Sequence, residues 1–250
     1  MAARSDNHVL LCVSHKKMIY TNFACVVVGT ILMILASLYY SFDTVTGTHC
    51  RVPNFLPTIS AAARDIPSRL IWQLIIIFHI PRGLLEVVVY HNYFSARLAD
   101  MNWHSSLMRM LNYVQSVTLA THHLSLLSLT LVTSAPPYYY IHEASFITFI
   151  VTSFVHMLML LTIMKLTDSD GRGLKTKSVR VRYFFIHAIL FVLSMGLFFR
   201  HNAYCEPYVY SYYAGMEYLV IFSNMMFYIF ITRDFPDLKL VMVGSGHKRD

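Results

Sequence analysis

The sequence predicts an all-α, polytopic membrane protein: a bundle of six transmembrane helices with both termini in the cytosol. Three observations lead to this prediction. Hydrophobic residues make up 56% of the 250 residues and charged residues only 13%, whereas a soluble domain carries about 25% charged residues. Six apolar runs are each close to the roughly 20 residues that cross a bilayer core. Most Lys and Arg residues fall in alternate connections, as the positive-inside rule requires of cytosolic segments.

The six runs define one membrane domain, residues 18–233, between a cytosolic N-terminal segment, 1–17, and a cytosolic tail, 234–250. The first run is too long for a cleaved signal peptide, which predicts an uncleaved signal anchor. We expect spans at Met18–Phe42, Leu70–Tyr90, Leu111–Thr133, Ile141–Met164, Tyr183–Phe199 and Val209–Ile231.

Placing the N-terminus in the cytosol leaves few basic residues on the luminal side. Of the 20 Lys and Arg residues, Arg82 lies within a span, and the luminal ones are Arg51, Arg64, Arg69 and Arg200. The net charge of +7 therefore reports topology, and no basic patch with interleaved aromatics points to nucleic acid. The basic connection Lys165–Arg182 is expected to be a solvated cytosolic loop.

The second run carries His79, Arg82 and Glu86 in its middle. At about 100° per residue these side chains fall within roughly 60° of one another, on one stripe of a helix. A charged side chain at the bilayer centre costs about 2.5–3.5 kcal/mol on insertion scales, so the stripe must face the bundle interior. Two interpretations remain open: a buried ion pair that locks helix packing, or part of a functional site.

Other polar residues fall at comparable depth in the membrane. Counting 1.5 Å per residue from the luminal ends places His122, His123 and Glu217 roughly 12–18 Å deep. His156 and Asn224 lie somewhat deeper. The adjacent His122 and His123 point to different helix faces, so no metal site is expected, and no cofactor. The chain also lacks conventional catalytic motifs such as the nucleophile elbow.

The luminal connections predict a polar cluster. The connection 41–69 contains three prolines and scattered apolar residues, which favours a folded cap. Cys50 in this connection and Cys205 between the last two spans both lie on the luminal side, where disulfides form, and we predict that they are bonded. The disulfide would bring together His49, Arg51, Arg200, His201, Asn202 and Glu206.

Several strings in these segments are specific. They include Thr48-His-Cys-x-Val-Pro-Asn-x-Leu-Pro57-x-x-Ser60, His79-x-Pro-Arg82 and Phe199-Arg-His-Asn-x-Tyr-Cys-Glu206. Together they resemble the Frag1/DRAM/Sfk1 family, which includes the N-terminal membrane domain of Cwh43-type proteins. The resemblance runs from about Met18 to Arg233. One departure lies in the third span, where the family has Glu-Asn and this chain has His122-His123.

The resemblance implies a multi-pass protein of the Golgi apparatus membrane, with the endoplasmic reticulum membrane as the alternative. It implies a role in GPI-anchor lipid remodelling, at the step that re-acylates lyso-GPI with a saturated chain on the luminal side. The implied partners are the GPI lipid or lyso-GPI-anchored proteins, an acyl donor, membrane lipids and other remodelling enzymes.

Two mechanisms fit this role. In an acyltransferase, His201 or His142 would be the general base, with Glu143 or Glu206 orienting it. Arg82, Arg200 and Asn202 would then hold a phosphate or an oxyanion. In a lipid-binding protein without catalysis, His79, Arg82 and Glu86 would hold the anchor, and Glu217 is a further candidate for substrate binding. An ion or proton pathway through the mid-depth His and Glu residues is a third interpretation. Structural roles remain open as well, with His201 and Asn202 capping a helix end and His142 and Glu143 beginning a helix.

Overall fold

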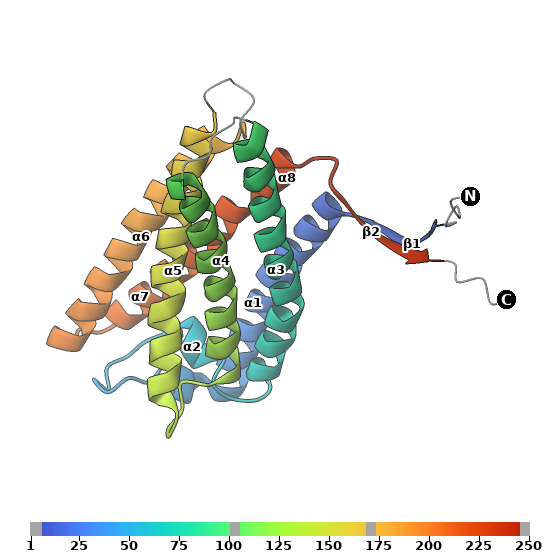
Figure 1. Ribbon diagram of the computed structural model, residues 1–250. Coiled ribbons are helices and arrows are strands. Elements are labelled where there is room, and N and C mark those ends of the chain that lie inside the picture. Colours follow the sequence, from blue (N-terminus) through green and yellow to red (C-terminus); the bar gives the residue numbers. More distant parts are fainter. Residues whose placement is uncertain (1–6, 101–105, 169–173, 246–250) are drawn as a thin grey trace, which may run out of the picture.

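The computed structural model describes residues 7–100, 106–168 and 174–245. The outer ends of both predicted cytosolic segments, and parts of two predicted cytosolic connections, lie outside these ranges. Six long helices run side by side (Figure 1): α1 (His15–Thr46), α3 (Ser68–Asp100), α4 (Ser106–Leu131), α5 (Tyr139–Leu166), α6 (Lys177–Tyr204) and α7 (Val209–Ile229). The short helices α2 (Ile59–Ala62) and α8 (Ile231–Asp234) and the strands β1 (Asn7–Ser14) and β2 (Lys239–Ser245) complete the described chain.

Each predicted span coincides with one long helix, although most of the helices extend beyond the predicted ends. Five helical segments are long and apolar enough to cross a membrane, and of the long helices described only α4 is not among them. A helix suits an apolar environment because it pairs its backbone groups internally. A predominantly α-helical, multi-pass membrane protein is therefore confirmed.

The helices place polar side chains inside the bundle and apolar side chains outside. The pattern is clearest on α4, which buries Asn112, Gln115, His122 and His123 and exposes Leu107, Met110, Tyr113, Leu124 and Leu131. These polar residues lower its hydropathy, although the large side chains that it exposes are mostly apolar. Gly83 of α3 allows close approach to α4, because a Cβ there would lie 2.3 Å from the His123 ring.

The strand pair β1–β2 was not predicted from the sequence, which treats both ends of the chain as tails. The strands are antiparallel, with Cys12 opposite Val241 and Ser14 opposite Lys239. Their pairing holds the two described ends of the chain next to each other, and the ribbon projects away from the helices (Figure 1). Strand formation agrees with the Val- and Leu-rich sequence of both segments.

Arg180 corrects the expectation that Lys165–Arg182 is a solvated loop. Helix α6 already begins at Lys177, and the Arg180 side chain is fully buried. Its guanidinium donates to the Phe227 carbonyl (2.9 Å), the Tyr90 hydroxyl (2.6 Å), Asp234 Oδ2 (2.7 Å) and Thr176 Oγ1 (3.0 Å). One arginine thus joins α6 to α3, α7 and α8.

The connection between α1 and α3 forms the folded cap expected from its prolines. A Cys50–Cys205 disulfide joins it to the turn between α6 and α7. The backbone N–H groups of Phe55 and Leu56 both donate to Ser211 Oγ, at 2.8 and 3.1 Å. The Tyr218 hydroxyl of α7 donates to the Pro57 carbonyl. The cap therefore sits on α7, and α2 is its last element before α3.

We expect Arg180→Met to lower the free energy of unfolding by about 3–5 kcal/mol, because it leaves Asp234 buried without its counter-charge. Unfolding in mixed micelles, followed by far-UV circular dichroism, measures the loss. Lys177→Met is the matched control: Lys177 pairs with Asp168 at 2.7 Å, but both side chains are partly exposed. Such a pair contributes at most about 1 kcal/mol. Equal losses in the two variants would contradict the structural role given to Arg180.

Candidate functional site

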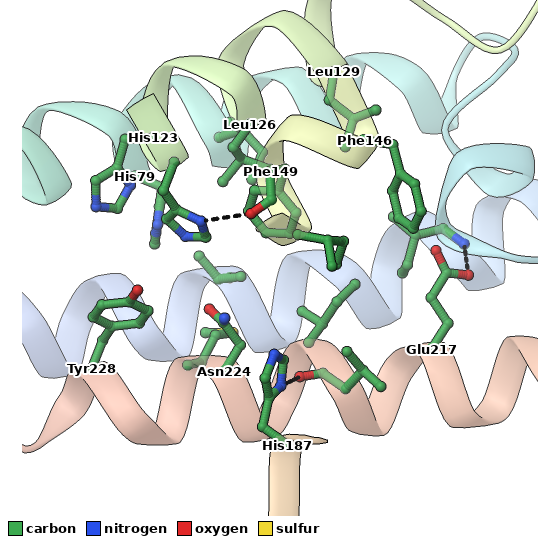
Figure 2. A pocket seen from close by; sticks show the side chains of 18 of the residues that line it. His79, His123, Leu126, Leu129, Phe146, Phe149, His187, Glu217, Asn224 and Tyr228 are labelled. Carbon is green, nitrogen blue, oxygen red and sulfur yellow. Dashed lines mark hydrogen bonds between the residues drawn. The ribbon is translucent and has the colours of Figure 1, made fainter. Parts of the chain in front are cut away.

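A cavity of about 110 Å³ lies inside the bundle, and α2 and all six long helices contribute to its wall. One buried water needs only about 10–15 Å³, so the cavity is much larger than a packing defect. Its wall is mostly apolar, with polar side chains at intervals along its length (Figure 2). An apolar chamber with a few polar groups is the usual form of a small-molecule or lipid site.

The stripe predicted on the second span forms a continuous hydrogen-bonded chain. His79 Nδ1 donates to Asn22 Oδ1 of α1 at 2.9 Å, which leaves His79 Nε2 to accept from Arg82 at 3.3 Å. The other end of the Arg82 guanidinium binds Glu86. Arg82 is 8% exposed and Glu86 fully buried. His79 and Arg82 both line the cavity, so the predicted stripe does face the interior.

The adjacent His122 and His123 take different directions, as their spacing predicts, yet both line the cavity. His122 donates from Nδ1 to the Phe149 carbonyl at 3.3 Å and stacks on the Phe149 ring. His123 is almost fully buried and lies 5.7 Å from His79, ring to ring. Within the described chain neither nitrogen of His123 has a hydrogen-bond partner. His123 thus offers unused donor and acceptor capacity beside His79.

Glu217 connects the cavity wall to the cap. Its Oε2 accepts the backbone N–H of Ile59 at 3.1 Å, a bond drawn in Figure 2. Ile59 is the first residue of α2, and Thr58 before it caps this helix by accepting the Ala61 N–H at 3.1 Å. Glu217, which the sequence offers as a substrate-binding residue, therefore holds the start of α2 in position.

His142 has a partner that sequence reasoning missed. Its Nδ1 donates to the Val132 carbonyl at 2.6 Å, and its Nε2 lies 3.0 Å from Ser60 Oγ of α2. Ser60 lines the cavity and also a smaller adjoining recess, which His142 lines too. The two residues are 82 positions apart, so no spacing rule could have paired them. The only sequence signal was that Ser60 ends the first family-like string.

Four other predicted residues lie outside the cavity wall. His201 is buried, with Nε2 3.2 Å from Thr48 Oγ1, and it sits in the last turn of α6, whose C-cap is Cys205. Arg200 binds Glu206 through two hydrogen bonds of 2.8 and 3.1 Å, which occupies both oxygens of that carboxylate. Asn202 is exposed. Of the predicted polar cluster, the structure brings His49 to 5.8 Å from His201, ring to ring, and pairs Glu206 with Arg200.

Glu143 does not take the place expected for it beside His142. Its side chain is exposed, and the Val132 carbonyl and Ser60 occupy the two ring nitrogens of His142. Consecutive helical residues point about 100° apart, which explains why the neighbour of a buried histidine faces outward.

Residues 17–238 match the family model described as the Frag1/DRAM/Sfk1/Cwh43P N-terminal domain. The chain belongs to this family. It is 31% identical to a protein of Xenopus tropicalis named "Acyltransferase PGAP2", over 92% of this chain and 93% of that protein. Proteins named "Post-GPI attachment to proteins factor 2" are 32% identical in Drosophila pseudoobscura pseudoobscura, over 85% of this chain and 82% of theirs, and 29% identical in Caenorhabditis elegans, over 87% and 85%. No solved structure matches the chain.

In this Frag1-family protein, Glu217 is expected to hold α2 in place. Glu217→Leu leaves the buried Ile59 N–H without an acceptor, at a cost of about 1–3 kcal/mol. Hydrogen exchange of peptides covering residues 53–63 should become faster. Glu217→Gln is the matched control, because its amide oxygen still accepts the bond. Equal exchange in the Leu and Gln variants would show that this hydrogen bond does not position the cap.

Proposed function

We propose that this Frag1-family protein acts in GPI-anchor lipid remodelling in the secretory pathway, where it transfers a saturated acyl chain to lyso-GPI. The names of its relatives support the pathway, and the name of the Xenopus tropicalis protein includes the word acyltransferase. The observation that carries the proposal is the intramembrane cavity, whose apolar wall suits an acyl chain and whose polar groups suit an ester and a phosphate. Soluble substrates have no need of such a chamber.

The proposal includes six spans, α1, α3, α4, α5, α6 and α7, with both termini in the cytosol. The outward apolar and inward polar surfaces of α4 support counting it as a span. The positive-inside distribution supports the orientation, and a disulfide in the cap supports placing Cys50 and Cys205 in the lumen. The cap then faces the leaflet that carries GPI anchors. We propose residence in the Golgi membrane, with the endoplasmic reticulum as the alternative.

Arg82 is proposed to hold the phosphate of the lipid. Its guanidinium lines the cavity and keeps one donor, Nε, without a partner among the described residues. Arginine binds phosphate through several charge-assisted hydrogen bonds. The same observation favours the second candidate function, a protein that binds lyso-GPI and presents it to a separate acyltransferase, because phosphate binding needs no proton transfer.

The first experiment combines the purified protein with lyso-GPI and a labelled saturated acyl donor. Wild type is expected to form the acylated lipid, and Arg82→Met to weaken lyso-GPI binding at least tenfold. Arg97→Met is the matched control, since Arg97 is an equally buried arginine of the same helix that does not line the cavity. Saturable binding without product would favour the presenting protein. Absence of both would contradict the proposed function.

The orientation predicts how cysteines react in sealed vesicles whose cytosolic surface faces outward. Cys12 of β1 is exposed and should react with a membrane-impermeant maleimide before permeabilisation. A cysteine introduced by Tyr138→Cys, at an exposed site in the α4–α5 connection, should react only afterwards. The Cys12→Ser variant shows how much of the labelling comes from Cys25, the other free cysteine. The reverse order of labelling would place the termini in the lumen.

A further inference from the structure

We propose that Ser60 is the nucleophile that carries the acyl group during transfer and that His142 is its general base. This inference rests on the proposed function and adds a covalent intermediate to it. The evidence is a serine and a histidine from distant segments, Ser60 Oγ and His142 Nε2, that lie 3.0 Å apart. Ser60 lines the cavity, and both residues line the smaller recess that adjoins it. A nucleophile and its base lie within about 2.6–3.2 Å in known serine enzymes.

The hydrogen bonds of His142 determine where its proton lies. The Val132 carbonyl can only accept, so His142 Nδ1, at 2.6 Å, must be the donor. In the neutral ring Nε2 then carries the lone pair and faces the Ser60 hydroxyl. A carbonyl that binds the far nitrogen of the base fixes its tautomer and orientation, which is one of the two roles of the acid in a catalytic triad. The pair is therefore arranged for proton transfer from serine to histidine.

The described chain contains other hydroxyl–histidine pairs, and their geometry lacks this arrangement. Ser116 lies 3.0 Å from His91 Nδ1 but donates to the Asn112 carbonyl of its own helix at 2.8 Å. Ser223 lies 3.0 Å from His187 Nδ1 and donates to the Val220 carbonyl at 2.8 Å. In both pairs the serine hydroxyl donates its hydrogen bond to a backbone carbonyl and not to the histidine.

The pair Thr48–His201 lacks an orienting group instead. His201 Nδ1 has no hydrogen-bond partner in the described ranges, so nothing determines which nitrogen carries the proton. By contrast, the Ser60 hydroxyl contacts only His142 among the described polar groups. His142 is thus better arranged as a base than His201, the other candidate from the sequence.

Ser60 is also accessible and firmly held. It is half-buried, and it lines the cavity beside Trp72 and Leu129. The Thr58 cap and the Glu217 contact hold the start of α2, on which Ser60 sits. An acyl carbonyl at Ser60 would have its chain in the apolar part of the cavity.

The transfer proceeds in two balanced steps, with a membrane glycerophospholipid as donor. In the first, Ser60 Oγ attacks the carbonyl carbon of the donor ester while its proton moves to His142 Nε2. The donor C–O bond breaks, and the lysophospholipid leaves with that proton. In the second, the lyso-GPI hydroxyl gives its proton to His142 Nε2 and attacks the acyl–Ser60 ester. Ser60 Oγ leaves and regains the proton.

The test incubates the purified full-length protein with a glycerophospholipid that carries a radiolabelled saturated chain, and in a parallel arm with labelled acyl-CoA. Protein-bound label is measured after denaturation and release by alkaline hydroxylamine, and the labelled peptide is located by mass spectrometry. Transfer to lyso-GPI is measured separately. Label is expected on the peptide containing Ser60, and Ser60→Ala should abolish it.

Both Ser60→Ala and His142→Gln are expected to lower transfer by at least about 100-fold, the lower end of the usual contribution of a catalytic base. Ser116→Ala is the matched control, since it also removes a hydroxyl 3.0 Å from a histidine but lies outside the cavity. It should transfer at the wild-type rate. Unchanged melting temperatures show that the variants are folded.

The outcomes separate the nucleophile from the proposed function. Transfer by a folded Ser60→Ala variant at the wild-type rate would overturn the role of Ser60 and leave the proposed function standing. Label on Ser60 without transfer to lyso-GPI would support Ser60 as the nucleophile and overturn lyso-GPI as the acceptor of the acyl chain. Label from acyl-CoA alone would support the nucleophile with a thioester donor. No protein-bound label from either donor would overturn the inference.

Discussion

The burial of charge in an apolar environment is the constraint on which this structure depends. The side chains of Arg180 and Asp234 are both fully buried, and hydrogen bonds to α3, to α7 and to the segment before α6 surround them. Arg82 and Glu86 form a second buried pair, extended by His79 and Asn22. Each charge without a partner would cost several kcal/mol. The helices that carry these groups can therefore adopt only the rotations about their axes that keep the groups inside the bundle.

The cap extends this organisation from the helices to the cavity. The disulfide, the Ser211 hydroxyl and Glu217 bind three successive parts of one connection to α6 and α7. Only the last of these parts, α2, reaches the cavity wall. A change at the disulfide can therefore influence Ser60 without touching it, because the chain between Cys50 and α2 is held along its length.

The cavity has two chemically different regions. Glu217 and Tyr228 of α7 both line it and are roughly 16 Å apart along the helix axis. At one end Glu217 binds the start of α2, the helix that carries Ser60. At the other end His79 and His123 lie near Tyr228 (Figure 2), and His79 accepts from the buried cation Arg82. The name of the Caenorhabditis elegans relative refers to GPI attachment, and the lipid substrate proposed above carries both a phosphate and an ester.

The amino-acid sequence by itself determined the membrane class, the six helical runs, the inward direction of His79, Arg82 and Glu86, and the cysteines that form the disulfide. Composition and periodicity suffice for these, because they depend on local hydrophobicity and on the side of the membrane. Only the tertiary structure decided that Ser60 meets His142, that Glu206 pairs with Arg200, that Arg180 is buried, and that β1 pairs with β2. Most of those contacts join segments that are distant in the sequence. The contact of Glu206 joins near neighbours, but the sequence left that carboxylate with several possible partners. All of them depend on helix rotation and on the path of the loops, which no local pattern specifies.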